Sequence, residues 1–262
     1  ESKTHPRPKL CGGGVTAHGE EQLQALGIVM NAPAFVVHRL AFRLGQQSVT
    51  IDHENAMRIF DRAEFDAALA RVVVDNQLSL RSGERLLDIE MTATGAVLTT
   101  DQQRYFARVV VAADGANSTI RRKLKLNTGP GVARLLRVMT PIQQPENNDI
   151  WRQQTAVFDF SCVKQHLQGY VWDFPSIMNG QPYMNRGIFD SRISPAPFGE
   201  RKHDKLRVIF DQSLRSRGVN LDDVLLDGVT ALHHLEHVVG VVAHVEPVHR
   251  TEDQHPVDRA GH

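Results

Sequence analysis

A cysteine followed by three glycines, Cys11 to Gly14, is the first part of the sequence whose residue types could do chemistry. Glycines let a backbone come close to a large planar ligand and offer it N–H groups, because they carry no side chain. Three glycines in a row also favour a loop over a helix or strand. Two interpretations stay open, a loop that lies against a ligand and a glycine loop without one.

A second candidate lies in the string VVVAADGANSTIRR, residues 109–122. Its apolar start predicts a strand over 104–112 that is buried on both faces of an α/β sheet, and a helix is expected near 118–122. Ligands of such sheets lie beyond the carboxyl ends of the strands. Gly115 would permit close approach there, and Asp114 could accept hydrogen bonds from sugar hydroxyls. The alternative is an ordinary Asp-Gly turn.

A third candidate is the string GYVWDFP, residues 169–175. In a strand, the side chains of Tyr170, Trp172 and Phe174 fall on one face. Three aromatic rings on one face form a flat apolar wall. The alternative is that the three rings are simply part of the core.

The first half of the chain supplies most of the elements that must position these motifs. A helix is expected over 20–26, ended by Gly27. Alternating residues predict a strand over 36–44 that turns at 45–47 into a second strand, 48–53. Asp61 and Glu64 have the spacing of a capping box and predict a helix over 62–76. Further strands are expected over 85–90 and 96–100.

The second half of the sequence has a different residue pattern. Residues 131–200 read as long alternating strands separated by turns rich in Pro, Gly and Asn. An amphipathic helix follows, ended by Gly218, with apolar positions at Leu206, Ile209, Phe210 and Leu214. The tail from Val229 is rich in histidine and has no clear strand or helix pattern, so residues 229–262 are assigned to neither domain.

Composition narrows the class of protein. The 262 residues are 41% hydrophobic and 23% charged, which is typical of a globular chain. Lys and Arg together number 30, as do Asp and Glu, so there is no electrostatic case for nucleic-acid binding. Two cysteines form no disulfide framework, and a cytoplasmic location is the default expectation. No stretch reaches the roughly 20 apolar residues of a membrane span.

Taken in order, the motifs resemble those of the geranylgeranyl reductase family of FAD-dependent oxidoreductases, within the p-hydroxybenzoate-hydroxylase-like flavoproteins. Residues 9–14 look like the family's cysteine-glycine loop, and residues 62–66 resemble its Arg-x-x-Phe-Asp helix start. Residues 113–115 resemble the second FAD fingerprint, and residues 170–175 are similar to a Tyr-x-Trp-x-Phe-Pro motif. The resemblance covers roughly residues 1–228. One departure is Leu167, where the family usually has a proline.

The resemblance implies roles for individual residues. Cys11 would lie near the flavin ring and the substrate double bond and act in catalysis. The cofactor FAD would be bound by Glu1, Cys11, Gly12, Gly14, Arg62, Leu86, Asp114 and Gly115. The wall of Tyr170, Trp172 and Phe174 would line a channel for an isoprenoid substrate. The electron donor would be NAD(P)H or reduced ferredoxin.

The resemblance also implies a fold and a division into domains. We expect an α/β fold, in which part of a Rossmann-like FAD domain interleaves with a mostly antiparallel substrate sheet. The FAD part would take residues 1–15 and 54–130, and the substrate part 16–53 and 131–228. Peripheral contact with a membrane follows only from the inferred lipid substrate.

Two family segments are not found in this sequence. The glycine fingerprint Gly-x-Gly-x-x-Gly is expected about 20 residues before Glu1. A Gly-Asp-Ala-Ala-Gly segment is expected beyond Gly228. The sequence therefore reads as a fragment with weak or no FAD binding on its own, since a helix N-terminus at that fingerprint holds the phosphates. In the tail, His233 and His237 could share a helix face and bind a metal, but no third ligand is evident, so no metal site is expected.

Three functions are compatible with these motifs. The leading one is hydride transfer from reduced flavin to a carbon-carbon double bond of an isoprenoid lipid. A flavin-dependent halogenase or hydroxylase is the second, because halogenases carry a related Trp-x-Trp-x-Ile-Pro motif. The third is a binding module without catalysis.

Overall fold

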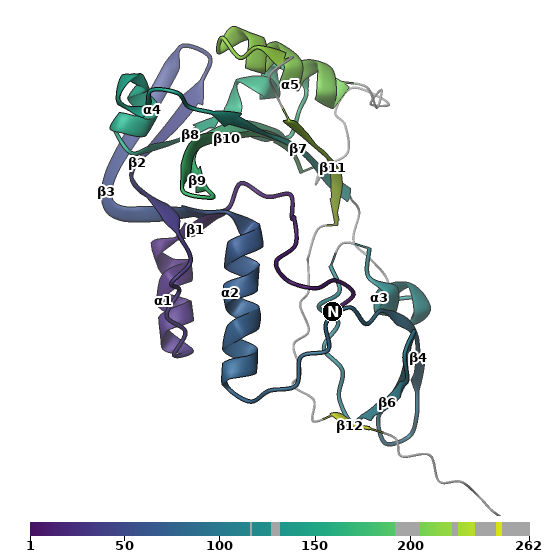
Figure 1. Cartoon of the computed structure of the whole chain (residues 1–262). Helices are drawn as coiled ribbons and strands as arrows, with labels where there is room; N and C mark the ends of the chain where they lie inside the picture. Colours follow the sequence, from purple (N-terminus) through teal and green to yellow (C-terminus); the bar gives the residue numbers. More distant parts are fainter. Residues whose placement is uncertain (116, 127–131, 192–204, 222–224, 234–244, 248–262) are drawn as a thin grey trace, which may run out of the picture.

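A computed structural model describes the chain except for residues 116, 127–131, 192–204, 222–224, 234–244 and 248–262. A large curled sheet and a small sheet lie at opposite ends of the molecule, with helices on both faces of the large one (Figure 1). The expected mixture of helices with a mostly antiparallel sheet is confirmed. No described helix has the length and apolar character needed to cross a bilayer.

The large sheet has eight strands in the order β1-β3-β2-β8-β9-β10-β7-β11. Every neighbouring pair is antiparallel except β2 and β8, which run parallel. The strands are β1 (Gly14–Thr16), β2 (Ala34–Leu44), β3 (Gln47–Phe60), β7 (Val132–Pro141), β8 (Thr155–Asp159), β9 (Gly169–Met178), β10 (Gln181–Asp190) and β11 (Leu225–His233).

The hairpin of β2 and β3 is longer than expected. The sequence predicted a second strand over 48–53. In the structure β3 continues to Phe60 past Asn55, whose φ of 54° marks an irregularity in the pairing with β2. The backbone N–H of Asn55 donates to His38 Nδ1 at 3.0 Å, which replaces a ladder bond at this point.

Two helices extend from one face of the large sheet, α1 (Ala17–Ala25) and α2 (Arg62–Asp75) (Figure 1). The Asp61 carboxylate accepts a hydrogen bond from the Ala63 N–H at 3.0 Å and caps α2, as its sequence predicted. Phe65 of α2 packs on Phe60 of β3, with ring centroids 4.8 Å apart. This contact fixes the start of α2 beside the end of β3.

The opposite face of the large sheet carries α5 (Lys205–Ser216). Its apolar positions are those expected from the sequence, and they pack on residues of β7, β9 and β10 in one core cluster. The short elements η1 (Pro145–Asn147), α4 (Asp149–Arg152) and η2 (Phe160–Gln165) join the strands. Each face of the sheet therefore has its own apolar core, and β9 contributes side chains to both.

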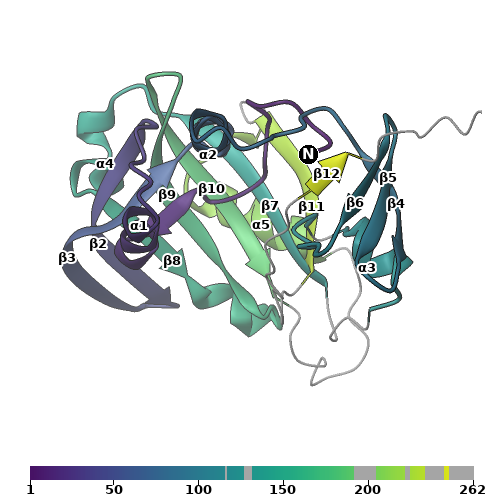
Figure 2. The same cartoon turned by 90° about the horizontal axis from the view of Figure 1, so that it is seen from below.

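The small sheet is antiparallel, in the order β12-β6-β5-β4. Its strands are β4 (Leu86–Met91), β5 (Ala96–Thr100), β6 (Arg104–Ala107) and β12 (Val245–Pro247). The helix α3 (Thr119–Lys123) packs on it through Ile120, which joins a cluster with Ile89 and Ala96. Seen from below, this sheet lies beyond the β7–β11 edge of the large one (Figure 2).

The prediction of a strand over 104–112 was wrong in its second half. The strand β6 ends at Ala107, and residues 111–115 are exposed and belong to no strand. A run of valines becomes a buried strand only where neighbouring strands pair with it. Within the described residues, no strand pairs with residues 108–113.

The histidine-rich tail has more structure than its pattern indicated. Residues 229–233 complete β11, which pairs with β7, and residues 245–247 form β12, which pairs with β6. His233 is the last residue of β11 and so belongs to a strand, and His237 lies outside the described residues. Long-range pairing forms these strands where the local sequence has no regular alternation.

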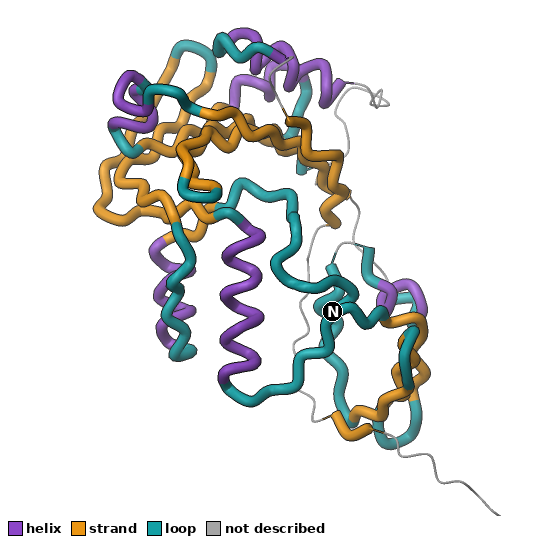
Figure 3. The backbone as a smooth tube through the Cα atoms, viewed as in Figure 1, coloured by secondary structure: helices purple, strands orange, loops and turns teal. Residues whose placement is uncertain are grey.

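The N-terminal segment connects the two sheets. It runs as a loop from the small sheet to β1 (Figure 3). Near its start, the Glu84 N–H donates to the Glu1 carbonyl at 3.1 Å and the amino terminus donates to the Arg81 carbonyl at 3.0 Å. At its end, the Cys11–Gly14 loop reaches the large sheet.

Candidate functional site

The cysteine-glycine loop is held in place by the end of β3. The Phe60 N–H donates to the Gly13 carbonyl at 3.0 Å. Gly13 has a φ of 76°, and a Cβ there would lie 2.1 Å from the Phe60 carbonyl oxygen. A side chain at Gly13 is therefore excluded both by conformation and by space. This packing requires a glycine at position 13, whichever ligand the loop meets.

The aromatic wall predicted from β9 exists, and the loop lies on it. Trp172 and Phe174 point to one face and are 3% and 5% exposed. A Cβ at Gly12 would lie 3.0 Å from Phe174 Cε2 and 3.4 Å from Trp172 Nε1, so Gly12 faces both rings with little room for a side chain between them. Tyr170 extends the wall, 6.3 Å from the Trp172 ring. The wall is at the same time part of the core and the surface on which the loop lies.

Two polar side chains of the large sheet tie the loop to this wall. The amide of Asn185, on β10, donates to the Cys11 carbonyl at 3.2 Å and to the Gly12 carbonyl at 3.0 Å. Its oxygen accepts from Trp172 Nε1 at 3.1 Å. Arg137, on β7, donates to the Cys11 carbonyl at 3.3 Å. Both residues were missed by sequence reasoning.

A chain of charged groups reaches the loop at Cys11. The Arg62 guanidinium donates to Asp66 at 2.8 Å, and Arg7 lies 3.7 Å from Asp66 and 3.5 Å from Glu1. Burial favours the neutral form of Arg62, but the neighbouring Cys11 and Asp66 outweigh this effect and raise its pKa. The sequence-predicted residues Glu1, Arg62 and Cys11 are thus joined in one electrostatic network.

The surroundings of the site shift the pKa values of two further side chains. Burial, reinforced by the nearby Cys11 sulfur, raises the pKa of Tyr170, so its hydroxyl stays protonated. For Glu1, burial is opposed by the Lys3 N–H and the Arg7 charge, which together lower its pKa. The site therefore combines a protonated phenol on the wall with an ionised carboxylate at the far end of the loop.

The remaining predicted residues lie at the small sheet. Leu86 starts β4 and packs against the cluster of Ile89 and Ile120. Asp114 accepts from the Thr119 and Ile120 N–H groups at 2.6 and 3.2 Å and so caps α3. Gly115 has a φ of 80° and open space where a Cβ would be. No contact among the described residues joins Asp114 or Leu86 to the Cys11 loop.

The residues present fit part of a large cofactor with polar and planar portions. Arg7 Nε and His5 Nδ1 are buried and have no hydrogen-bond partner within the described residues. Buried polar atoms of this kind need a partner, since leaving them unpaired is costly. The glycine loop on the aromatic wall offers a flat surface close by. Gly12, Arg62, Arg7 and His5 would contact such a cofactor.

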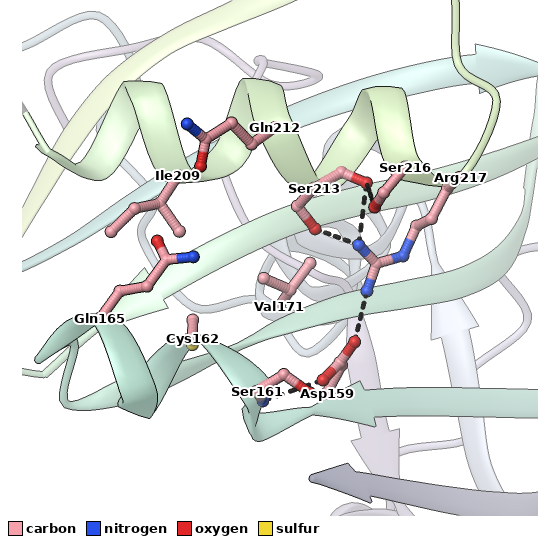
Figure 4. A pocket seen from close by; sticks show the side chains of 10 residues that line it. All are labelled: Asp159, Ser161, Cys162, Gln165, Val171, Ile209, Gln212, Ser213, Ser216 and Arg217. Carbon is pink, nitrogen blue, oxygen red and sulfur yellow. Dashed lines mark hydrogen bonds and ion pairs between the residues drawn. The ribbon is translucent and has the colours of Figure 1, made fainter. Parts of the chain in front are cut away.

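A separate cavity of about 280 Å³ lies on the opposite face of the sheet, under α5 (Figure 4). Its charged groups are already paired, because Arg217 donates to Asp159 and to Asp173 at 2.8 Å each. Burial raises the pKa of the Cys162 thiol to about 11, which keeps this sulfur neutral. The cavity thus lies beside a structural joint between α5 and the sheet, and it contains no activated nucleophile among the described residues.

The structure brings most of the predicted site together. Around the loop lie six predicted residues: Cys11, Gly12, Arg62, Tyr170, Trp172 and Phe174. Gly14 starts β1, with the Met57 sulfur 2.6 Å from where its Cβ would be. The sequence did carry a signal for one feature that was not predicted, the close approach of the Trp172 ring to Gly187. A glycine inside a strand pattern often marks such an approach.

Comparison with known proteins places the fold among the flavoproteins. No family model matches the chain. It is 25% identical over 206 residues to a menaquinone reductase of Mycolicibacterium smegmatis, across 73% of this chain and 48% of that protein. The chain spans about half the length of the curated relatives it matches.

Two solved structures show the same fold. A geranylgeranyl bacteriochlorophyll reductase-like protein of Thermoplasma acidophilum superposes with a TM-score of 0.67 at 16% identity, over 88% of this chain and 58% of that one. A halogenase variant in complex with FAD gives 0.63 at 13% identity, over 88% and 54%. The chain has the fold of FAD-dependent oxidoreductases and monooxygenases, and its resemblance to the geranylgeranyl reductase group is confirmed at that level.

Proposed function

We propose that this chain forms the substrate wall and the cysteine-glycine loop of an FAD-dependent reductase that saturates carbon-carbon double bonds of an isoprenoid lipid. One observation carries the proposal. Gly12 faces the Trp172 and Phe174 rings so closely that even a Cβ there would crowd them, and Arg62 lies close to Cys11. The similarity to a menaquinone reductase supports a reductase over the other activities of this fold.

The residues of the chain would act mainly by position. Trp172 and Phe174 are almost fully covered, so they would support the loop from behind and exclude water, while the partly exposed Tyr170 ring would meet the uncharged isoprenoid chain. Cys11 lies at the junction of loop and wall, where its thiol can deliver a proton to one carbon of the double bond. FAD, when bound and reduced, supplies a hydride to the other carbon. Arg62 would contact the FAD and hold the Cys11 side of the loop.

The electron donor and the membrane contact follow from the same proposal. NAD(P)H or reduced ferredoxin would reduce the flavin. The lipid substrate would be taken from a bilayer, and the protein would then touch the membrane only peripherally, from the cytoplasmic side. The alternative activity is halogenation or hydroxylation, favoured by the shared fold with an FAD-bound halogenase. A third possibility is a binding module unable to hold FAD.

Flavin retention tests the proposal. The chain is mixed with FAD, desalted and measured by flavin absorbance, beside a version extended upstream with the Gly-x-Gly-x-x-Gly unit and downstream with the Gly-Asp-Ala-Ala-Gly segment. The extended protein should retain FAD, and Arg62→Ala should weaken retention about tenfold, as expected for a lost charge-assisted contact. Arg207→Ala, in an exposed pair with Asp211 on α5, should have no effect. Retention by neither version would exclude the flavin site.

A further inference from the structure

Asn185 is almost completely buried, with 2% of its surface exposed, and it lies on β10 between the loop and the wall. A buried amide must satisfy its oxygen and both N–H donors. Here the oxygen accepts from the Trp172 indole at 3.1 Å, and the nitrogen donates to the carbonyls of Cys11 and Gly12 at 3.2 and 3.0 Å. One side chain therefore binds both parts of the candidate site.

The orientation of this amide is determined by the indole. Trp172 Nε1 is a donor only, so it selects the oxygen end of the Asn185 amide and turns the nitrogen towards the loop. The indole is itself fixed, because Gly187, opposite it on β10, leaves space only for the ring. A rigid wall thus sets the direction in which the amide donates.

We propose that Asn185 is a positioning residue that locks the Cys11–Gly12 backbone to the Trp172 indole, so that loop and wall keep one relative placement. This inference rests on the proposed function and deepens it, because it assigns a residue that would hold the flavin-side loop at a fixed distance from the substrate wall. Arg137 assists from β7 by donating to the Cys11 carbonyl. Asn185 is the residue that joins loop and wall through a single amide.

Cysteine alkylation tests, without any flavin, whether the Asn185 hydrogen bonds hold the loop on the wall; this connection is called the lock below. The chain has two cysteines, Cys11 in the loop and Cys162, which is buried under α5. Cys162 lies on the opposite face of the sheet, beside the cavity under α5, so its rate reports opening of that core and not of the loop. Peptide mass spectrometry gives both rates. Asn185→Leu, of similar size but unable to hydrogen-bond, should accelerate alkylation of Cys11 about tenfold relative to Cys162.

A second variant tests the hydrogen bond between the Trp172 indole and Asn185. Trp172→Phe keeps a ring but removes the N–H, and should accelerate Cys11 alkylation by a smaller factor. In the double variant the two effects should be less than additive, since both remove the same connection. Asn185→Ser, which is small and introduces little strain, carries the same expectation if Asn185→Leu does not fold.

A matched control separates positioning from general destabilisation. Ile188→Val lies on the same strand but packs into the core under α5. It should leave the Cys11 rate unchanged, and any effect should fall on Cys162, which belongs to the same core cluster. The proposal is overturned if Asn185→Leu leaves the Cys11 to Cys162 ratio unchanged. Because no flavin is present, a failed FAD test and a failed lock are distinguishable.

Discussion

Gly187 lies directly opposite Trp172 in the β9–β10 pair, and a Cβ on Gly187 would be 2.0 Å from the indole carbon Cζ2. The indole therefore occupies the place of a side chain on the neighbouring strand. This arrangement explains how the widest ring of the wall fits flat against the sheet. It also holds the indole N–H towards Asn185.

Gly187→Ala should destabilise the fold, because the ring system of Trp172 cannot bend away as a flexible side chain would. The expected loss is about 1–3 kcal/mol in the free energy of unfolding, as for overpacked cores. Urea denaturation measures it. In a Trp172→Phe background the smaller ring leaves room, and the cost of the alanine should fall. An equal cost in both backgrounds would show that the indole is not the obstacle.

Arg217 should be far more important for stability than the exposed arginine Arg207. Arg217 is half-buried between Asp159 and Asp173, so Arg217→Met leaves Asp159 without its cation, while Asp173 keeps its ion pair with Arg186. The expected loss is about 1–3 kcal/mol, since the half-buried Asp159 carboxylate keeps its charge without a partner. Arg207→Met removes an exposed pair with Asp211 and should cost about 0.5 kcal/mol or less. Similar losses in the two variants would contradict the buried network.

Comparison of these elements with the sequence shows what local pattern can and cannot reveal. The helix over 62–76 was predicted well because its cap, Asp61, and its apolar spacing are local signals. The one-sided wall of β9 followed from strand periodicity. The valine run at 109–113 misled, because a strand buried on both faces depends on neighbours that no local pattern identifies.

The polar residues of the candidate site could not be predicted from the local sequence for the same reason. Asn185 and Arg137 lie 174 and 126 residues from Cys11, and only the order of strands in the large sheet brings them to it. Glu1 and Arg62 could be named from the resemblance alone. Their connection through Arg7 and Asp66 became visible only in the structure.

Stability should fall at alkaline pH because of Cys162. Its pKa is raised from 9.0 to about 11 by burial, so the fold tolerates only the protonated thiol. Its contribution is complete below the pKa of the unfolded chain and is lost as pH rises through 9.0 to about 11. The loss is on the order of 2 kcal/mol. Urea midpoints across this range should fall less in Cys162→Ala than in the parent, while Cys11→Ala should follow the parent. Parallel curves for all three proteins would refute the assignment.

Asp61 should contribute the usual stability of an N-cap to α2. Asp61→Ala removes the acceptor of the Ala63 N–H and should cost about 1 kcal/mol in thermal or urea unfolding. Asp75→Ala, at the last residue of the same helix, serves as control. It should be neutral or slightly stabilising, because an acidic residue there opposes the helix dipole. A loss from Asp75→Ala as large as that from Asp61→Ala would argue against capping.

The most direct test of the central claim is the product formed from a geranylgeranyl lipid. The extended protein, loaded with FAD and reduced without oxygen, is incubated with the lipid, and the product is analysed by mass spectrometry. We predict a gain of two hydrogens for each double bond reduced, and a strong loss of this product in Cys11→Ala. An unchanged lipid, together with hydroxylation or halogenation of an aromatic substrate once oxygen is admitted, would contradict a double-bond reductase.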